Sequence, residues 1–435
     1  MIDCLEELED ITDTLIFEDE PSILTHEHAV DMLETALHLM DEYMNENPNA
    51  MADPDFHENL LEEIKDIFYI QMEEHILSSD YVEDDLNDIL DVAFDIYIST
   101  FHVERSHFDT TVIDKKDEHN LIADKIQGLK NIPQPVQRTS EWYIFRWNLI
   151  TASNAWKAFE SQSTMNQLIY EKCQPLKDFS IAEDEIVMVN TNSTLHWGQK
   201  YEPLSVLIYE YMYKLKVEDF GCIKHPKYDF IGASPDGIIT DMSSDRYGRM
   251  LEIKNIVNRE INGIPKKEYW IQMQLQMEVC DLDECDFLET KFTEYPDYNS
   301  YKNDIIADDM FKGTIIYFHT KEGAPHYEYM PLNLKTLEEV SGWEEETLQK
   351  FESKYVFIKF LYWKLEKLSC VLVKRNREWF NNNVGQMEKV WKIIEEERVS
   401  GYEHRAPKKN KSVKNFVKNT TENPEVCVLK VIKLG

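Results

Sequence analysis

The stretch YDFIGASPDGIITDMSSDRYGRMLEIKNIV, residues 228–257, decides how this chain folds. Its first and last parts, YDFIGAS and MLEIKNIV, are short and rich in β-branched and aromatic residues, which is typical of β-strands. Between them lie two turn signals, Pro235-Asp236-Gly237 and Ser243-Ser244-Asp245. The pattern therefore predicts a hairpin that pairs the first part with the last.

Two acids and a lysine come together in this predicted hairpin. Asp236 stands where the first strand breaks into its turn, and side chains alternate along a strand, so Glu252 and Lys254 project to one face. Two carboxylates offer hard oxygen ligands to Mg²⁺, and an ammonium group beside them can orient the attacking water and help to deprotonate it. This set of groups is suited to metal-dependent hydrolysis of a phosphodiester.

The motif Ser234-Pro235-Asp236-Gly237 followed by Glu252-Ile253-Lys254 resembles the signature of the PD-(D/E)XK nucleases, and more narrowly that of the YqaJ-type, lambda-exonuclease-like viral recombinases. The resemblance implies an α/β fold with a restriction-endonuclease-like core, in which helices flank a mixed central sheet. It also implies a Mg²⁺ cofactor, with Mn²⁺ as a substitute, held by Asp236, Glu252 and the carbonyl of Ile253.

A second block, QRTSEWYIFRWNLITASNAWKAF (residues 137–159), places Trp142, Arg146 and Ser153 at the spacing Trp-x3-Arg-x6-Ser. It is either an amphipathic helix with a buried tryptophan or an anion site, because a guanidinium and a hydroxyl near a helix N-terminus are suited to bind phosphate. The block also resembles the first motif of the YqaJ family, in which the equivalent arginine and serine hold the 5′-phosphate end of DNA.

The resemblance therefore implies a set of DNA 5′-phosphate ligands: Arg146, Ser153, Ser234 and Arg259. One feature departs from the family pattern, which has an arginine six residues after the lysine. This chain has Glu260 at that position and Arg259 one residue earlier. Dependence on a 5′-phosphate therefore stays open.

Two predicted helices flank the hairpin in the chain. Residues 196–215 carry Glu202, and residues 266–280 place Gln272 and Gln276 on one face. By themselves, a helix glutamate and a stripe of glutamines are more often surface groups. The resemblance instead implies that Glu202 is a further metal ligand and that Gln272 reaches the metal centre. The catalytic set it implies is Glu202, Asp236, Glu252, Lys254 and Gln272.

The formal net charge of −36 is distributed unevenly along the chain. Residues 1–100 contain 30 Asp and Glu against one basic residue, whereas residues 405–435 contain eight Lys and Arg against two acids. Apolar residues at helical spacing in 25–45, 55–77 and 82–101 predict a small acidic helical bundle. Its acids form either a solvated face or a surface that imitates DNA charge or docks a basic partner.

We predict five segments, with C-terminal helices after the core and a second hairpin at 313–332 inside it. They are an acidic helical domain (1–105), a linker (106–135), a PD-(D/E)XK nuclease core (136–335), a C-terminal helical extension (336–404) and a basic flexible tail (405–435). The tail is either a DNA tether or a nuclear address.

No apolar run approaches the ~20 residues of a membrane span, and no basic-then-apolar leader opens the chain. The seven cysteines are scattered, which favours reduced thiols over a disulfide framework. We therefore expect a soluble intracellular protein, in the cytoplasm or nucleus of an infected host cell.

Together these features predict a Mg²⁺-dependent deoxyribonuclease, a 5′→3′ double-strand exonuclease of viral recombination, replication or repair. The expected partners are double-stranded DNA ends and a single-strand annealing or replication protein, without a membrane, and the family resemblance adds a homo-oligomeric ring. Two alternatives remain open: a structure-selective endonuclease of the same fold, and an interaction scaffold that uses the acidic N-terminal domain.

Overall fold

The computed structural model describes residues 25–71, 80–106, 119–137, 139–176, 190–191, 193–304 and 311–407. Residues 408–435 fall outside these ranges, and with them nearly all of the predicted basic tail. Within the described ranges, none of the helices combines the length and the apolar character that crossing a membrane requires.

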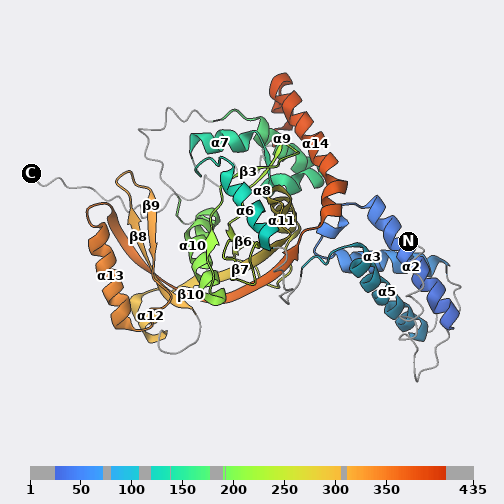
Figure 1. Cartoon of the computed structure of the whole chain (residues 1–435), viewed down its shortest axis with the longest axis horizontal. Helices are drawn as coiled ribbons and strands as arrows, with labels where there is room; N and C mark the ends of the chain where they lie inside the picture. The colour runs from blue at the N-terminus through green and yellow to red at the C-terminus, as the bar shows by residue number, and fades with distance from the viewer. Residues whose placement is uncertain are drawn as a thin grey trace, which may run out of the picture.

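Three amphipathic helices form the N-terminal bundle (Figure 1). They are α2 (His26–Glu46), α3 (Phe56–Gln71) and α5 (Asp80–Phe101), with the short helix η3 (Ala50–Ala52) between the first two. Each turns an apolar stripe inward, so that side chains such as Leu33, Leu60 and Leu90 are buried in a shared core. The three predicted helices are confirmed over the described residues.

A mixed sheet of seven strands, in the order β2-β5-β6-β7-β10-β8-β9, runs through the rest of the molecule. The strands are β2 (Val217–Glu218), β5 (Gly237–Ile239), β6 (Met250–Asn255), β7 (Glu284–Glu294), β8 (Lys312–His319), β9 (Pro325–Tyr329) and β10 (Val356–Lys374). Strands β6 and β7 pair in parallel, and the other neighbouring strands pair antiparallel. The hairpin predicted at 313–332 is confirmed as β8 and β9.

Helices cover both faces of the sheet at β6. Helix α10 (Thr194–Tyr213) packs Tyr209 against Leu251 and Ile253, whereas helix α11 (Lys267–Cys280) contacts Glu252 from the other face. Alternation along β6 thus gives α10 the apolar face and α11 the polar one. This arrangement confirms the predicted α/β class with a mixed sheet flanked by helices.

The predicted pairing of residues 228–234 with 250–257 is wrong. Strand β4 (Ile231–Ala233) belongs to a separate small sheet, where it lies between β1 (Ile150–Thr151) and β3 (Ile223–Lys224). The strand breaks at Ser234-Pro235, because proline has no N–H to donate to a ladder. The chain then starts β5, and β5 forms the hairpin with β6.

The predicted helical character of 336–404 is also wrong in its middle. Helices α13 (Leu337–Phe351) and α14 (Arg377–Ser400) are present, but β10 lies between them and pairs with both β7 and β8 (Figure 1). Leu361, Trp363 and Leu365 are buried at every second position, the period of a strand.

The other helices fill the edges of this framework. They are α6 (His119–Asn131), α7 (Ser140–Trp147), α8 (Ala152–Ala155), η4 (Trp156–Phe159), α9 (Gln162–Cys173), α12 (Tyr298–Asp304) and η6 (Glu403–Arg405). Helix α6 lies inside the segment predicted as a linker, and it buries Ile126 and Leu129. These two apolar side chains tie the segment to the core instead of leaving it solvated.

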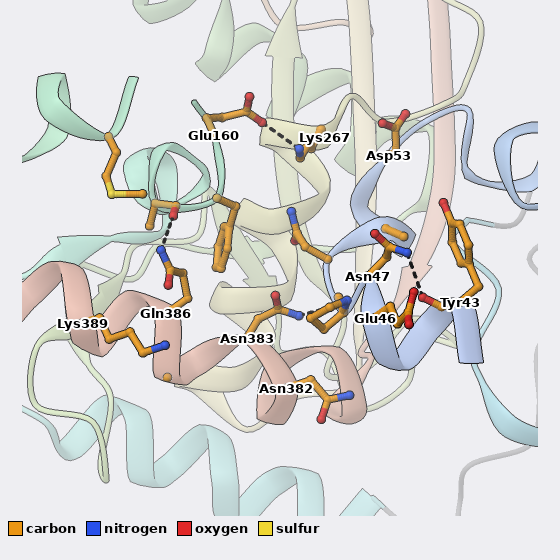
Figure 2. A pocket seen from close by; sticks show the side chains of 17 residues that line it. Tyr43, Glu46, Asn47, Asp53, Glu160, Lys267, Asn382, Asn383, Gln386 and Lys389 are labelled. Carbon is orange, nitrogen blue, oxygen red and sulfur yellow. Dashed lines mark hydrogen bonds and ion pairs between the residues drawn. The ribbon is translucent and has the colours of Figure 1, made fainter. Parts of the chain in front are cut away.

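The bundle contacts the core through the loop around η3. Trp379 Nε1 donates to Asn49 Oδ1 (3.1 Å), and Asn383 Nδ2 donates to the Pro48 carbonyl (2.7 Å). On the other side of the loop, Trp270 Nε1 donates to the Arg105 carbonyl (3.0 Å). A cavity of about 670 Å³ opens along this junction, bordered by the end of α2, by η4 and by α14 (Figure 2).

Candidate active site

Asp236 is fixed by its backbone and its carboxylate to neighbouring residues of β6. Its N–H donates to the Leu251 carbonyl (3.1 Å), and its Oδ2 accepts from the Ile253 N–H (2.7 Å). The next residue is a glycine, Gly237, because a Cβ at that position would collide with the Val217 side chain of β2. The Pro-Asp-Gly turn therefore places a carboxylate beside the middle of β6.

Glu252 is fully buried on β6, and its two oxygens have different partners. Gln276 Nε2 donates to Glu252 Oε2 (2.7 Å) and to the Ser234 carbonyl (3.2 Å), while Lys254 Nζ donates to Glu252 Oε1. Gln276 is also fully buried. It was missed as a site residue, although its i, i+4 spacing from Gln272 placed both on one helix face.

Lys254 lies between its strand and α11. Besides its bond to Glu252, its Nζ lies 3.4 Å from Gln272 Oε1 and 4.9 Å from the centre of the Tyr269 ring. Within the predicted set, Lys254 therefore contacts Glu252 and Gln272 directly, and Asp236 is linked to them through the backbone N–H of Ile253. Tyr269 was not anticipated from the sequence.

The charges in this cluster do not balance. Burial raises the pKa of Asp236 well above its usual value, and repulsion by Glu252 and Glu202 adds to the effect. Burial alone would lower the pKa of Lys254, but attraction to Glu252 and Asp236 raises it, so the side chain stays an ammonium. Carboxyl groups therefore outnumber ammonium groups here, and the raised pKa of Asp236 favours a proton on it where no cation is bound.

This surplus of carboxylate oxygen fits a divalent cation, which would lie near Asp236 and Glu252. Across the part of the chain that the structure describes, no three His, Cys, Asp or Glu side chains converge on one point. Asp236 and Glu252 offer the carboxylates, and the Ile253 carbonyl stays a predicted third ligand.

Glu202 approaches from α10 and is exposed. Its charge reaches Asp236, because it contributes to the raised pKa of that residue. A hydrogen-bond network fixes α10 to the sheet: Asn255 Nδ2 donates to the Gly198 carbonyl (3.2 Å), and Asn255 Oδ1 accepts from Ser205 Oγ and Thr290 Oγ1, both at 2.7 Å. The network fixes the helix turns on either side of Glu202.

The predicted phosphate ligands Arg146 and Ser153 lie on different elements. The Arg146 guanidinium stacks over the Trp142 ring (4.5 Å), and its carbonyl accepts a hydrogen bond from Lys172 Nζ (2.7 Å). Ser153 is exposed on α8, which packs against α11 and β4. The shared phosphate pocket stays a prediction.

Arg259, a third predicted phosphate ligand, forms an ion pair with Glu289 of β7. Its Cζ lies 5.8 Å from the centre of the Tyr269 ring, the same ring that Lys254 contacts. Arg259 therefore lies at the site in spite of the register difference noted in the sequence. Glu289 is fully buried, and nothing in the motif indicated it.

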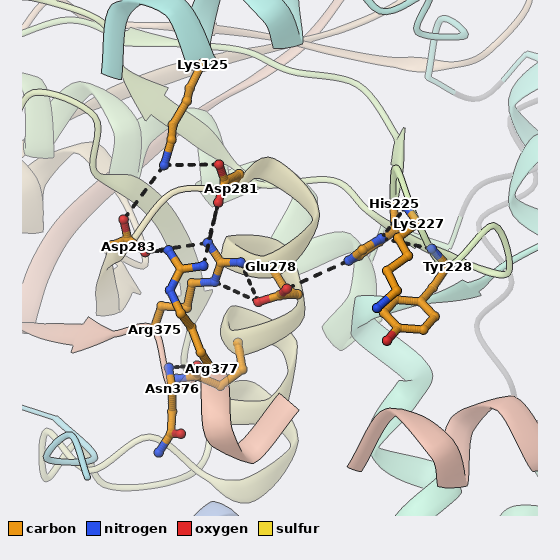
Figure 3. Close-up of polar contacts among 11 residues, drawn as sticks. Lys125, His225, Lys227, Tyr228, Glu278, Asp281, Asp283, Arg375, Asn376 and Arg377 are labelled. Carbon is orange, nitrogen blue, oxygen red and sulfur yellow. Dashed lines mark hydrogen bonds and ion pairs between the residues drawn. The ribbon is translucent and has the colours of Figure 1, made fainter. Parts of the chain in front are cut away.

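A basic patch of Arg375 and Arg377, where β10 leads into α14, is engaged within the protein. Arg375 is buried and contacts Glu278, Asp281 and Asp283, and Arg377 contacts the same two aspartates (Figure 3). Opposite charges on the loop after α11 neutralise these guanidinium groups. The patch is a structural ion-pair network.

Comparison with known proteins agrees with these motifs. Residues 141–283 match the family model of the YqaJ-like viral recombinase domain, and this range contains the whole cluster except Glu289. The chain is 27% identical over 347 residues to the uncharacterized protein R354 of Acanthamoeba polyphaga mimivirus. The match covers 71% of this chain and 60% of that relative, so the chain spans less than two thirds of its length.

Two solved structures show weaker similarity. An alkaline exonuclease from Laribacter hongkongensis aligns with a TM-score of 0.32 and 18% identity, over 61% of this chain and 95% of that one. A phage-related exonuclease from Haemophilus somnus aligns with a TM-score of 0.31 and 12% identity, over 57% of this chain and 94% of that one. The family resemblance predicted from the sequence is confirmed by the family model.

Proposed function

Because residues 141–283 form a YqaJ-like viral recombinase domain, we propose that this protein is a Mg²⁺-dependent deoxyribonuclease that degrades double-stranded DNA from a 5′ end. One observation carries the proposal: Lys254 donates to Glu252, and the Asp236 carboxylate accepts from the N–H of Ile253 between them, so two acids and a lysine gather at the middle of β6. A buried group of like charges costs stability, and a cation-dependent reaction is a physical reason to keep it.

In the proposed mechanism, Asp236, Glu252 and the Ile253 carbonyl hold the cation, with Glu202 nearby. When bound, the cation supplies positive charge to the attacked phosphate, where negative charge develops. Lys254 carries a proton and donates hydrogen bonds, so we assign it the role of orienting the attacking water. Gln276 fixes one oxygen of Glu252 and leaves the other for Lys254.

The preference for a DNA end rests on Arg146, Ser153, Ser234 and Arg259, which we propose as ligands of a terminal phosphate. A structure-selective endonuclease with the same catalytic cluster remains the second candidate. The acidic bundle contacts the core on α11 and α14, so a scaffold role for its outer surface is compatible with either activity.

The deciding experiment compares linear duplex DNA that carries a 5′-phosphate with covalently closed circular DNA, both in Mg²⁺. We expect degradation of the linear duplex from its 5′ end and survival of the circle. Asp236→Asn and Glu252→Gln should each lower the rate of DNA cleavage by about 10²-fold or more, which is the usual effect of removing one group that stabilises the transition state.

A matched control is Glu171→Gln, which alters a surface carboxylate paired with Lys157. It should cleave at the normal rate. Efficient nicking of closed circles would replace the exonuclease proposal with the endonuclease one, and normal cleavage by Asp236→Asn would place the active site elsewhere.

A further inference from the structure

Glu289 is a charged group that the proposed mechanism does not use. It is fully buried on β7, where it pairs in register with Lys254 of the parallel neighbour β6. Register partners project to the same face of a sheet, so Glu289 faces α11 together with the catalytic lysine. Its neighbour on that face is Phe287, which packs against Tyr269.

The contacts of Glu289 are one-sided. One oxygen, Oε1, accepts from the Arg259 guanidinium, and the other, Oε2, is buried and has no hydrogen-bond partner among the described residues. Burial raises the pKa of this carboxyl, and Arg259 and Lys266 counteract the rise. An apolar residue would fill such a position at no loss of stability, because buried ion pairs are often neutral or costly compared with apolar packing.

Arg259 is the accessible member of the pair. Its side chain is 24% exposed, against 0% for Glu289. Two of its N–H groups are engaged, one with Glu289 and one with the Glu260 carbonyl (3.1 Å). A guanidinium has five N–H donors, so three remain for an anion that approaches from solvent.

We propose that Glu289 is a positioning residue: it anchors Arg259 beside Tyr269 and Lys254 so that the guanidinium binds a phosphate of the DNA strand next to the catalytic cluster. The proposal rests on the proposed function for the identity of the anion. The Tyr269 ring, contacted by both cations, sets the separation between Arg259 and Lys254. A lysine at 259 would lose the fork that lets one edge hold Glu289 while another holds phosphate.

The test measures DNA binding apart from cleavage. The full chain and its variants Arg259→Gln, Glu289→Gln and the double variant are titrated with 5′-phosphorylated duplex in EDTA over a range of salt concentrations. Arg259→Gln should weaken binding about tenfold and reduce the slope of log affinity against log salt by about 0.9, the value for one lost phosphate contact. Glu289→Gln should weaken binding while keeping the slope, because Arg259 still carries its charge.

The decisive comparison is the double variant. If Glu289 acts only through Arg259, Glu289→Gln should add nothing in the Arg259→Gln background, within about twofold, and in Mg²⁺ both single variants should raise KM more than they lower kcat. Independent, additive losses, or a normal salt slope in Arg259→Gln, would overturn the proposal. Glu284→Gln, which removes the Arg249 partner at the start of β7, controls for simple loss of an ion pair.

Failure of the two proposals can be told apart. If wild-type protein cleaves no DNA, but Arg259→Gln loses one phosphate contact and Glu289→Gln adds no further loss to it, the nuclease proposal fails and the Glu289 proposal stands. If wild-type protein cleaves and the slope is unchanged in Arg259→Gln, only the Glu289 proposal fails.

Discussion

At the scale of single residues, several buried charged side chains are paired with a residue of opposite charge. Arg246 and Arg249 bind the fully buried Asp286 on the α10 side of the sheet, and Glu252 binds Lys254 on the α11 side. Lys172 is different. It is buried, and its Nζ donates to the backbone carbonyl of Arg146 near the end of α7, which is a neutral acceptor. Its surroundings make its charge costly.

Lys172 should make stability depend on pH. Burial first, and then repulsion by Arg146 of α7 and Arg398 of α14, lower its pKa to about 7; Cys222 and Glu171 act in the opposite direction. The unfolded chain binds this proton up to a pKa near its usual value of about 10.4, so the unfolded state holds more protons between pH 7 and 10 and stability rises with pH there.

The variant Lys172→Met lacks this contribution. Compared with it, wild-type protein should gain about 2 kcal/mol of unfolding free energy between pH 7 and 9, since one proton is worth about 1.4 kcal/mol per pH unit. Denaturant unfolding of both proteins at the two pH values measures this difference. Parallel pH profiles would show that Lys172 keeps its proton in the folded chain.

At the scale of elements, the sequence predicted local features well and pairings poorly. The Glu-x-Lys face of β6 followed from alternation, and the bundle helices followed from apolar spacing, because both are properties of a few neighbouring residues. Strand β4 pairing with β1, and β10 inserting between β7 and β8, depend on contacts between distant residues. Glu289 could not be found for the same reason, since only the β6–β7 register brings it to Lys254.

The contact of α10 with the sheet gives a prediction at this scale. Asn255→Ala removes the acceptor of Ser205 and Thr290 and the donor to Gly198, which should cost about 1–3 kcal/mol of stability. Because this network holds the turns around Glu202, the Mg²⁺ concentration for half-maximal cleavage should also rise.

The control is Tyr209→Phe, which loses a hydrogen bond to Asp286 farther along α10. It should lower stability without changing the Mg²⁺ requirement. An identical Mg²⁺ requirement in Asn255→Ala would show that the network has a structural role alone.

At the scale of the whole molecule, the acidic bundle is a fixed part of the structure. Its loop provides the acceptors for Trp379 and Asn383, and Arg105 provides that for Trp270. Removing residues 1–105 would strip these acceptors and uncover apolar side chains such as Trp270 and Trp379, which share a core with the bundle. In a truncated chain, a change in DNA binding could therefore not be assigned to the lost acidic surface, because stability would change as well. Substitutions that change only charge separate the two effects.

Four exposed acids of α2 can be neutralised together: Glu27→Gln, Asp31→Asn, Glu34→Gln and Glu42→Gln. A matched set of four lies on or next to α13, at the other end of the molecule (Figure 1): Glu338→Gln, Glu345→Gln, Glu346→Gln and Glu352→Gln. The bundle lies to one side of β6 and α10, so its charges act on DNA through solvent, where screening has a length of about 8 Å at physiological salt. Both sets should change duplex affinity by less than about twofold at 0.15 M salt, and by similar factors at lower salt. If the α2 set alone tightens binding tenfold or more at low salt, the bundle lies along the DNA path and its acids act as an electrostatic gate.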